Sequence, residues 1–369
     1  MKYKFETKTI GDCCDIIKES IHPEKGQFYT CFSLPAFDNS NTPEILNGEE
    51  IKSSKFVLDE NTILFNKLNP KFRRVWNIHS LEKYENTICS TEFLPLKAKA
   101  NIEQDYLYYY VSSPYFTRLM DGIRTGTSNS QQRIDWKQFL REPINVPSLP
   151  IQRKAVSLLR NIDKKIELNN AINNNLEQQA QAIFDSMFPN ISNGENTIGD
   201  TITPKRGKGL LSKNAVFGNV PVVAGGLEPS TYHNTANTKA PVLAISASGA
   251  NAGFVSLWNI PIWSSDSSFI DSSMTDDVYF WYVLLKKRQR EIYDSQTGSA
   301  QPHIYPQHIA AMPISDLNFD DVRNYTSIVT PIFEMIGLNK DENARLATTR
   351  DTLLPKLMSG ELDVSDIEI

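Results

Sequence analysis

The residues that most often carry catalysis or bind metals are present, but they form no recognisable catalytic pattern. The five histidines are scattered, and His303 and His308 are separated by Pro306, which would break a helix between them. None of the four cysteines forms a C-x-x-C pair, so we expect reduced, mostly buried thiols. The chain also has no Walker P-loop, no H-E-x-x-H, no G-x-S-x-G elbow and no glycine-rich dinucleotide fingerprint. We therefore predict no catalytic residue and no metal site.

Positive charge gathers in a few loops despite an acidic composition. The formal net charge is −5 and the pI is about 5.7, which argues against a protein that coats nucleic acid by itself. The basic loops also contain glycine or asparagine, so backbone amides and cationic side chains could reach a phosphate together. The first cluster contains Lys67, Lys71, Arg73 and Arg74, followed by Arg124 and Arg133; the second contains Lys205, Arg206, Lys208 and Lys213. A charge cluster alone is often only a solvated face.

Two polar loops, residues 125–133 and 296–303, carry amide, hydroxyl and imidazole groups of the kind that hydrogen-bond to base edges in a DNA groove. Each loop lies close in sequence to basic residues. The candidates for DNA contact in these loops are Thr127, Gln132, Arg133, Ser299, Gln301 and His303.

The chain contains an internal repeat. Thr9-Ile10-Gly11-Asp12 recurs as Thr197-Ile198-Gly199-Asp200, at an offset of 188 (197 minus 9). Further on, Thr125-Gly126-Thr127, Gln132-Arg133-Ile134 and Pro143-Ile144 are echoed by Thr297-Gly298-Ser299, Pro302-His303-Ile304 and Pro313-Ile314, and the last offset is 170 (313 minus 143). The chain therefore consists of two copies of one plan, and the first copy is about 18 residues longer (188 minus 170).

Each copy begins with short segments rich in Val, Ile, Phe, Thr and Trp between Gly, Pro, Asn and Ser turns, which predicts a compact sheet. The predicted strands include residues 55–58, 62–65 and 87–90 in the first copy, and 220–224, 241–246 and 253–258 in the second. An aromatic helix is predicted over residues 104–120 and again over 278–293. We therefore expect an α/β (α+β) fold with two domains, each a small twisted sheet with helices.

Each copy ends in a long helix with a coiled-coil repeat. Ala155, Leu158, Ile162, Ile172, Leu176 and Ile183 follow steps of three and four, and adding 170 gives Tyr325, Ile328, Ile332, Glu342, Leu346 and Leu353. Asn169 matches Asn339, and a buried asparagine commonly fixes the register of such helices. We predict two long antiparallel coiled-coil helices related by a pseudo-twofold repeat. The alternative is two unrelated amphipathic helices, each packed on its own domain.

These patterns divide the chain into four parts. They are a first sheet domain over residues 1–149, a central helix over 150–190, a second sheet domain over 191–316, and a C-terminal helix with an acidic tail over 317–369. We expect the tail after Gly360 to be solvated and frayed. A helix over residues 151–187 would be about 55 Å long at ~1.5 Å per residue, so we expect its length to set the spacing of the two domains.

The order and duplication of these segments resemble the specificity subunit of type I restriction-modification systems, in which two target recognition domains are joined by two helical spacers. The similarity covers essentially the whole chain. It rests on residues 182–188 (AIFDSMF), 246–253 (SASGANAG), 297–304 (TGSAQPHI) and 353–362 (LLPKLMSGEL). The run at 246–253 adds Ser248 and Asn251 to the candidates for DNA contact. The first copy departs from this pattern, with residues 66–71 (NKLNPK) in place of the glycine run, as expected if the two domains read different half-sites.

The resemblance implies a non-catalytic subunit that binds double-stranded DNA at a bipartite site. Its partners are then methyltransferase subunits, two in number, and ATP-driven restriction/translocase subunits. S-adenosylmethionine, ATP and magnesium belong to those partners, and this chain carries no cofactor of its own. If the partners supply much of the phosphate contact, the acidic pI of this subunit is compatible with DNA binding.

Two other classes of function remain compatible with the sequence. One is a coiled-coil scaffold that assembles partner proteins without reading DNA, and the other is an enzyme whose site is assembled from distant segments. The length of 369 residues fits two or three domains. No stretch reaches the roughly 18 consecutive apolar residues of a membrane span, and the first residues lack the apolar core of a signal peptide. We therefore expect a cytoplasmic protein without a membrane segment.

Overall fold

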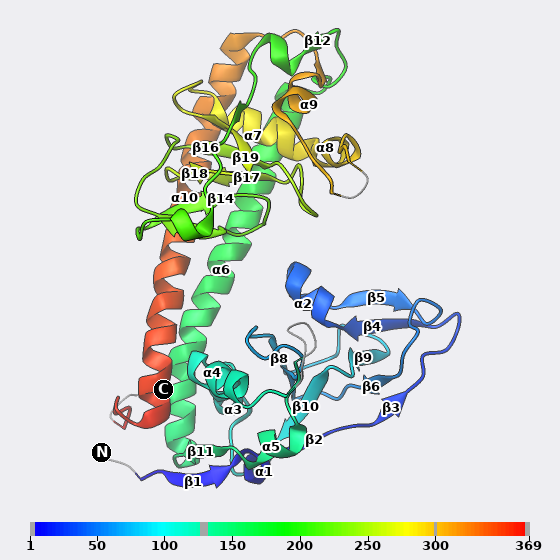
Figure 1. The fold of residues 1–369 in the computed structure, drawn as a ribbon, viewed down its shortest axis with the longest axis vertical. Helices are drawn as coiled ribbons and strands as arrows, with labels where there is room; N and C mark the ends of the chain where they lie inside the picture. The colour runs from blue at the N-terminus through cyan, green and yellow to red at the C-terminus, as the bar shows by residue number, and fades with distance from the viewer. Residues whose placement is uncertain (1–3, 126–131, 299–300, 366–369) are drawn as a thin grey trace. The chain divides into compact units, whose positions relative to one another are not determined.

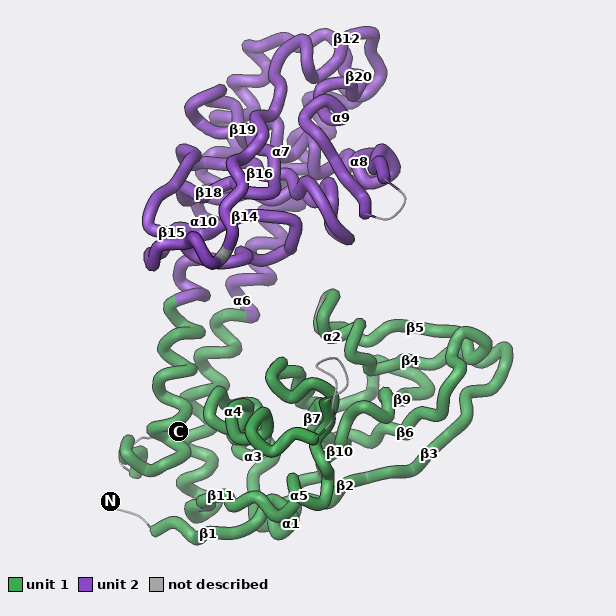
Figure 2. Tube along the Cα trace, in the orientation of Figure 1, with its two compact units in different colours: residues 1–166, 345–369 green, residues 167–344 purple. Residues whose placement is uncertain are grey.

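The computed structural model describes residues 4–125, 132–298 and 301–365, which form two compact units (Figure 2). Unit 1 contains residues 1–166 and 345–369, and unit 2 contains residues 167–344. The two longest helices are α6 (Leu149–Met187) and α10 (Phe319–Ser359) (Figure 1). Each of them contributes a segment to both units (Figure 2). Each unit folds around its own hydrophobic core.

Both units contain a four-stranded antiparallel sheet of the same topology. In unit 1 the strand order is β2 (Cys14–Ile16), β10 (Phe93–Ala98), β7 (Thr62–Asn66), β8 (Val75–Ile78). In unit 2 it is β13 (Lys205–Arg206), β19 (Ser267–Asp271), β16 (Val242–Ser246), β17 (Val255–Trp258). The inner strands β7 and β16 are buried along their whole length. The repeat in the sequence is therefore a repeat of one fold.

Each unit also has a second sheet built around one parallel pair of strands. In unit 1 the order is β3 (Ser20–Ile21), β6 (Lys55–Val57), β9 (Thr87–Ser90), β4 (Phe28–Phe32), β5 (Glu44–Asn47). In unit 2 it is β18 (Trp263–Ser264), β14 (Val220–Val223), β15 (Thr231–His233). The parallel pairs β4–β9 and β14–β18 correspond, while β3 and β6 are additional strands of the longer first copy. All six strands predicted from the sequence are confirmed.

The recurring Thr-Ile-Gly-Asp sequence forms a helix-capping turn in both units. It follows β1 (Glu6–Thr9), which pairs with β11 (Pro143–Val146), and β12 (Asn196–Thr197), which pairs with β20 (Pro313–Ile314). In the short helices α1 (Ile10–Cys13) and η1 (Ile198–Asp200), the aspartate accepts hydrogen bonds from the threonine amide and hydroxyl at 2.7–2.8 Å. The glycine leaves room for a helix, α5 (Trp136–Arg141) in unit 1 and α9 (Pro306–Ala310) in unit 2.

The predicted aromatic helices are each two helices. In unit 1 they are α3 (Gln104–Val111) and α4 (Pro114–Gly122), and the break coincides with Pro114, which cannot continue the hydrogen-bond ladder. In unit 2 they are α7 (Val278–Lys287) and α8 (Gln289–Asp294), which meet at Arg288. Arg288 is buried, with φ −94° and ψ 17°, and its guanidinium donates to the carbonyl of Pro313 and to Glu291.

Within unit 2, α6 and α10 run antiparallel and meet through asparagines. The Asn169 amide group donates to Asn343 (2.9 Å) and Glu342 (2.7 Å), and that of Asn339 donates to Asn173 (2.8 Å). Adding 170 to Asn169 and subtracting 170 from Asn343 gives the pair Asn339–Asn173. The matched asparagines therefore obey the predicted repeat, although Asn169 and Asn339 contact different partners and not each other.

The predicted apolar seam of the long helices is correct only in part. Ala155 and Tyr325 are buried, and Leu176 is half-buried, but Ile172 and Ile328 are 48% and 42% exposed. Their neighbours Asn173 and Val329 are buried instead. The reason is that these helices also pack on the sheet domain of each unit, which rotates the buried stripe by one residue relative to a two-helix coiled coil.

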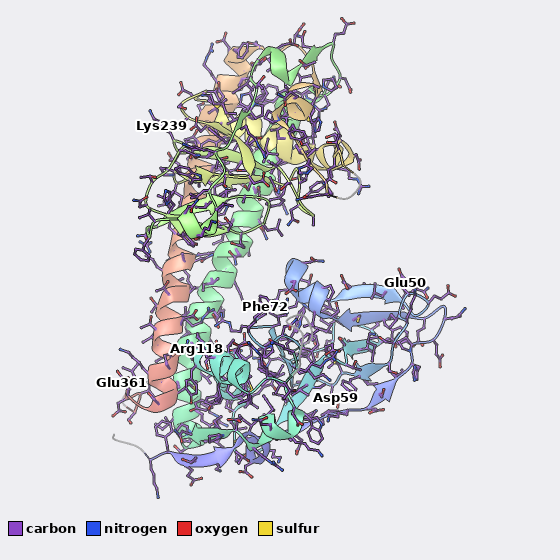
Figure 3. All side chains as sticks on the ribbon, viewed as in Figure 1. Glu50, Asp59, Phe72, Arg118, Lys239 and Glu361 are labelled. Carbon is purple, nitrogen blue, oxygen red and sulfur yellow. The ribbon has the colours of Figure 1, made fainter. Side chains whose placement is uncertain are left out.

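The chain beyond α10 is folded as far as Ser365, contrary to the expected frayed tail. Val364 is fully buried in the core of unit 1, and the Lys154 ammonium donates to the carbonyl of Ser365 (2.5 Å). Glu361 is exposed, as its labelled side chain in Figure 3 shows. Apolar residues between the acidic ones therefore hold the tail. No helix among the described residues is long and apolar enough to cross a membrane.

Candidate nucleic-acid interface

In unit 1 the loop after β7 and the end of the polar loop are joined by backbone hydrogen bonds. The Ile134 amide donates to the carbonyl of Lys67 (3.0 Å). Arg133 pairs with Thr125 through amide-to-carbonyl bonds in both directions, at 2.9 and 3.0 Å. The candidates Lys67 and Arg133 therefore lie on adjacent backbone segments held by the sheet.

Unit 2 repeats this arrangement with different side chains. The Ile304 amide donates to the carbonyl of Ala247 (2.9 Å), and His303 pairs with Thr297 through amide-to-carbonyl bonds of 2.8 and 3.0 Å. A further bridge joins Ser248 to His303. The predicted equivalence of Arg133 and His303 is confirmed. The same framework thus presents a guanidinium in one unit and an imidazole in the other.

The turn after β7 and β16 explains why the two loop sequences differ and still fold alike. Asn69 and Gly249 both adopt a positive φ, of 52° and 84°, and asparagine and glycine are the residues that tolerate this conformation best. The Asn69 amide donates to the carbonyl of Gln132 (2.7 Å), and the Gly249 amide donates to that of Pro302 (3.1 Å). The NKLNPK and SASGAN runs are therefore structurally equivalent.

An acidic residue that the sequence analysis missed stands next to the candidates in both units. Glu92 precedes β10 and its carbonyl accepts from the Lys67 amide (3.0 Å); Asp266 precedes β19 and its carbonyl accepts from the Ala247 amide (3.1 Å). Glu92 and Asp266 therefore occupy the same place in the repeated fold. No local sequence signal marks them, because the partner strand lies far away in the chain.

The two carboxylates bind the candidate side chains. Glu92 accepts from Nη2 (2.7 Å) and Nε (3.2 Å) of Arg133, and these hydrogen bonds raise the pKa of Arg133 above its usual value. Asp266 accepts from Nη2 of Arg206 (2.6 Å) and from the hydroxyl of Ser248. The structure thus brings Arg206 and Ser248 together in unit 2 although they are 42 residues apart (248 minus 206).

The remaining arginine candidates of unit 1 are tied to other parts of that unit. Arg74 makes a two-pronged ion pair with Asp38 at 2.6 and 2.7 Å, on α2 (Leu34–Ser40). Arg124 pairs with Asp121 at the end of α4. Arg73 donates to the carbonyl of Ser112 (3.2 Å) and lies 3.8 Å from Asp351 on α10. The side chains of these three thus bind partners other than Glu92, although the Arg74 carbonyl accepts from the amide of Asn66, next to Lys67 (3.1 Å).

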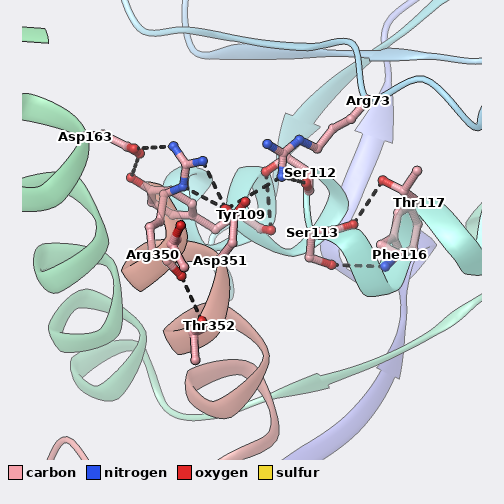
Figure 4. A network of polar contacts seen from close by, with 11 residues as sticks. Arg73, Tyr109, Ser112, Ser113, Phe116, Thr117, Asp163, Arg350, Asp351 and Thr352 are labelled. Carbon is pink, nitrogen blue, oxygen red and sulfur yellow. Dashed lines mark hydrogen bonds and ion pairs between the residues drawn. The ribbon is translucent and has the colours of Figure 1, made fainter. Parts of the chain in front are cut away.

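Figure 4 shows the network that Arg73 joins. Asp163 of α6 accepts from the Tyr109 hydroxyl (2.6 Å) and from Arg350 of α10 (2.7 Å), and Arg350 also reaches Asp351 (3.0 Å). Burial opposes the charge of Arg350, but the hydrogen bonds from its guanidinium to Asp163 and Asp351 raise its pKa. Burial and the bond to Asp163 raise the pKa of Tyr109. This network anchors the basic loop and α3 to both long helices within unit 1.

Lysines lie beside exposed aromatic rings at two places on unit 1. The Lys18 ammonium lies 3.6 Å from the ring centroid of Trp136, which is 40% exposed. Desolvation and the charge of Lys67 both lower the pKa of Lys18. Lys71 lies 5.0 Å from the ring centroid of Phe72, which is 48% exposed and labelled in Figure 3. Exposed aromatics beside cations are surfaces that can stack on bases and neutralise phosphates.

In unit 2 the lysine candidates lie on an exposed segment without acidic residues. Lys205, Lys208 and Lys213 are exposed, and residues 201–227 contain no Asp or Glu. The carbonyl of Lys208 accepts from the Trp263 indole (2.8 Å), which fixes this segment to β18. His303 stacks on Tyr305 with ring centroids 6.0 Å apart.

Four more candidates have simpler outcomes. Gln301 is exposed, and Asn251 is half-buried, with its carbonyl accepting from the amide of Phe254 (3.0 Å). Thr127 and Ser299 lie outside the described residues. Whether any candidate touches DNA stays a prediction.

All four cysteines are buried and unpaired, as predicted, and burial raises the pKa of Cys13 to about 11 and of Cys14 to about 12, so these thiols are poor nucleophiles. Among the described residues no group of His, Cys, Asp and Glu side chains could hold a metal ion.

The chain is similar to known proteins in both sequence and structure. The family model described as the type I restriction modification DNA specificity domain matches residues 2–178. The HindI specificity subunit of Haemophilus influenzae is 28% identical over 172 residues, which cover 42% of this chain and 37% of that protein. The MjaIX specificity subunit of Methanocaldococcus jannaschii is 24% identical over 310 residues, which cover 73% of this chain and 71% of that protein.

A solved structure shares the fold across nearly the whole chain. The crystal structure of the S subunit of a type I restriction-modification system from M. genitalium superposes with a TM-score of 0.56, covering 97% of this chain and 96% of that one, at 19% sequence identity. The arrangement of small sheets and long helices therefore belongs to a known fold.

Proposed function

Because the chain belongs to the family of type I restriction-modification specificity subunits, we propose that it is the non-catalytic subunit that recognises a bipartite DNA target. Unit 1 reads one half of the target and unit 2 reads the other. The chain directs two methyltransferase subunits and the restriction/translocase subunits to that target. S-adenosylmethionine, ATP and magnesium act in those partners.

The observation that carries this proposal is the pair of matched loop frameworks. Both units hold the end of the polar loop against the sheet with the same backbone hydrogen bonds. The side chains on this framework differ, with Lys67 and Arg133 in unit 1 and Ser248 and His303 in unit 2. Backbone bonds that fix position, combined with side chains that vary, suit two readers of different base sequences.

The distribution of charge supports a subunit that shares DNA with partners. The net charge of −5 gives little long-range attraction to phosphates. Several arginines near the candidate loops are already paired with acids, among them Arg74 with Asp38 and Arg133 with Glu92. Most phosphate neutralisation is therefore left to the methyltransferase subunits, and this chain contributes sequence discrimination.

The experiment that tests the proposal is a methylation map of the host genome with and without the gene for this chain. We expect a discontinuous methylated sequence that disappears on deletion and returns when the gene is restored. An unchanged map would support the competing function, a scaffold that assembles partner proteins without reading DNA.

A further inference from the structure

We propose that Glu92 is a positioning residue that fixes Arg133 so that Arg133 reads a guanine in the half-site of unit 1. Asp266 holds the side chains of Arg206 and Ser248 in unit 2 in the same way. This inference rests on the proposed function and adds to it the base and the side-chain edge that recognises it.

The geometry of the Arg133–Glu92 pair determines which edge of the guanidinium remains available. Glu92 occupies Nε and one proton of Nη2, at 3.2 and 2.7 Å. The guanidinium has five N–H donors in a planar fork. The end formed by Nη1 and Nη2 is therefore left to donate two parallel bonds, and O6 and N7 of guanine in the major groove are the acceptors that match this end.

The pair contributes little to folding, so stability does not explain its presence. The side chains of Arg133 and Glu92 are 49% and 26% exposed, and ion pairs exposed to this degree contribute little to stability. A carboxylate beside DNA also repels phosphate. Glu92 instead neutralises the charge of Arg133, so Arg133 binds phosphates at random sequences more weakly. The remaining N–H groups of Arg133 still donate directional hydrogen bonds to a base.

The second unit provides an independent instance of the same device. Asp266 occupies the position equivalent to Glu92 and binds both Arg206 and Ser248. Because the Ser248 hydroxyl donates its proton to Asp266, its lone pairs are left to accept a hydrogen bond. Unit 2 therefore presents an acceptor to the amino group of adenine or cytosine, whereas unit 1 presents a donor fork to guanine.

The test uses the full chain and four variants, Glu92→Gln, Arg133→Lys, Arg133→Gln and the double variant Glu92→Gln/Arg133→Gln. Binding is measured on a random duplex and on a duplex carrying the target defined by methylation mapping, over a range of salt concentrations. Glu82→Gln, on an exposed turn of unit 1, is the control for the change of charge.

For Glu92→Gln we expect tighter binding to the random duplex, because Arg133 is freed to reach a phosphate. The slope of log affinity against log salt should steepen by about 0.9, the value for one added phosphate contact, and the double variant should lose this increment. Arg133→Lys keeps the charge but not the fork, so it should lose about 5- to 100-fold of the discrimination at one guanine. In cells, Arg133→Lys should methylate sites with another base at that position of one half-site only.

Three results would overturn the inference. They are an unchanged slope in Glu92→Gln, a steeper slope that persists in the double variant, or full guanine discrimination in Arg133→Lys. Arg133→Lys decides the matter alone should Glu92→Gln fold poorly. The proposed function itself would fail if the wild-type chain preferred no DNA sequence and its deletion left the methylation map unchanged. The inference alone would fail if the wild-type chain were selective and the variants bound DNA with the same selectivity and salt dependence.

Discussion

In both units the sheet domain packs on the long helices through an apolar core and polar bonds, but a charged network stands out in unit 1 and an aromatic cluster in unit 2. In unit 1, Tyr109 and Arg350 converge on Asp163. In unit 2, Phe184 lies among Phe188, Phe280 and Tyr325 with centroid separations of 5.1, 5.5 and 5.4 Å. The offset of 170 carries Asp163 to Phe333, which stacks on Tyr279 with ring centroids 4.8 Å apart. A ring therefore stands in unit 2 where unit 1 has the carboxylate.

This difference shows which parts of the fold are constrained. The capping turns, the paired strands and the loop bridges use backbone groups or a few short side chains, and they are the same in both units. The junctions need only fill volume and satisfy buried polar groups, and either rings or an ion-pair network does so. The copies could therefore diverge in sequence without losing their common architecture.

The largest expected effect is at the aromatic junction. Replacing the fully buried Phe184 by alanine removes ring contacts with three aromatic neighbours and leaves a cavity. We expect the free energy of unfolding of unit 2 to fall by about 3–5 kcal/mol in chemical denaturation. Ile172→Ala on the same helix, where the side chain is 48% exposed, should cost less than about 0.5 kcal/mol. Equal losses in the two variants would contradict this description of the junction.

A smaller effect is expected at the ionic junction. Asp163→Asn keeps the shape of the side chain but removes the charge that binds Tyr109 and Arg350. In the ion pair, the side chains of Arg350 and Asp163 are 21% and 25% exposed. Hydrogen bonds to charged groups contribute about 1.5–3 kcal/mol, so we expect a loss of that size in the stability of unit 1. The control is Asp320→Asn, which removes the exposed pair with Arg323 and should cost less than about 1 kcal/mol. A loss no larger than that of the control would mean that the network in Figure 4 does not anchor unit 1.

The smallest effect on stability is expected at the capping aspartates, Asp12 and Asp200, and it should be the same in both units. The hydrogen bond from the Thr9 amide lowers the pKa of Asp12, and that from Thr197 lowers the pKa of Asp200. Since each folded pKa lies below the unfolded value of about 3.9, the stabilisation is complete above that pH and is lost as pH falls through the folded pKa. Thermal unfolding of Asp12→Asn and Asp200→Asn should therefore approach that of the wild type below pH 4. A difference in unfolding temperature that does not depend on pH would argue against the capping role.

The sequence predicted those features whose residues have a local role. The Thr-Ile-Gly-Asp turn could be found because its capping bonds and its close contact with a helix require those residues. The seam of the long helices was misplaced at Ile172 and Ile328, because periodicity does not show that a helix also packs on a sheet. The acidic composition of the tail predicts a solvated segment, but the apolar residue Val364 packs in the core of unit 1 and holds it in place.

The candidate site was predictable in its position but not in its contacts. Arg133 and His303 followed from the repeat alone, and the backbone bridges bear out their equivalence. Glu92 and Asp266 could not be found, since they reach the loops only through strand pairing across the sheet. Arg73 and Arg74 stood in the same basic run as Lys67, but the fold directs them to Ser112 and Asp38.

The central claim, that the two units read separate half-sites, is tested most directly by exchanging one reader. Residues 197–311 are replaced by the corresponding segment of a relative with a different target, and the methylated sites are mapped in cells. We expect one half of the target sequence to change and the other half to stay as it was. A change in both halves, or a fully methylated original target, would contradict the account.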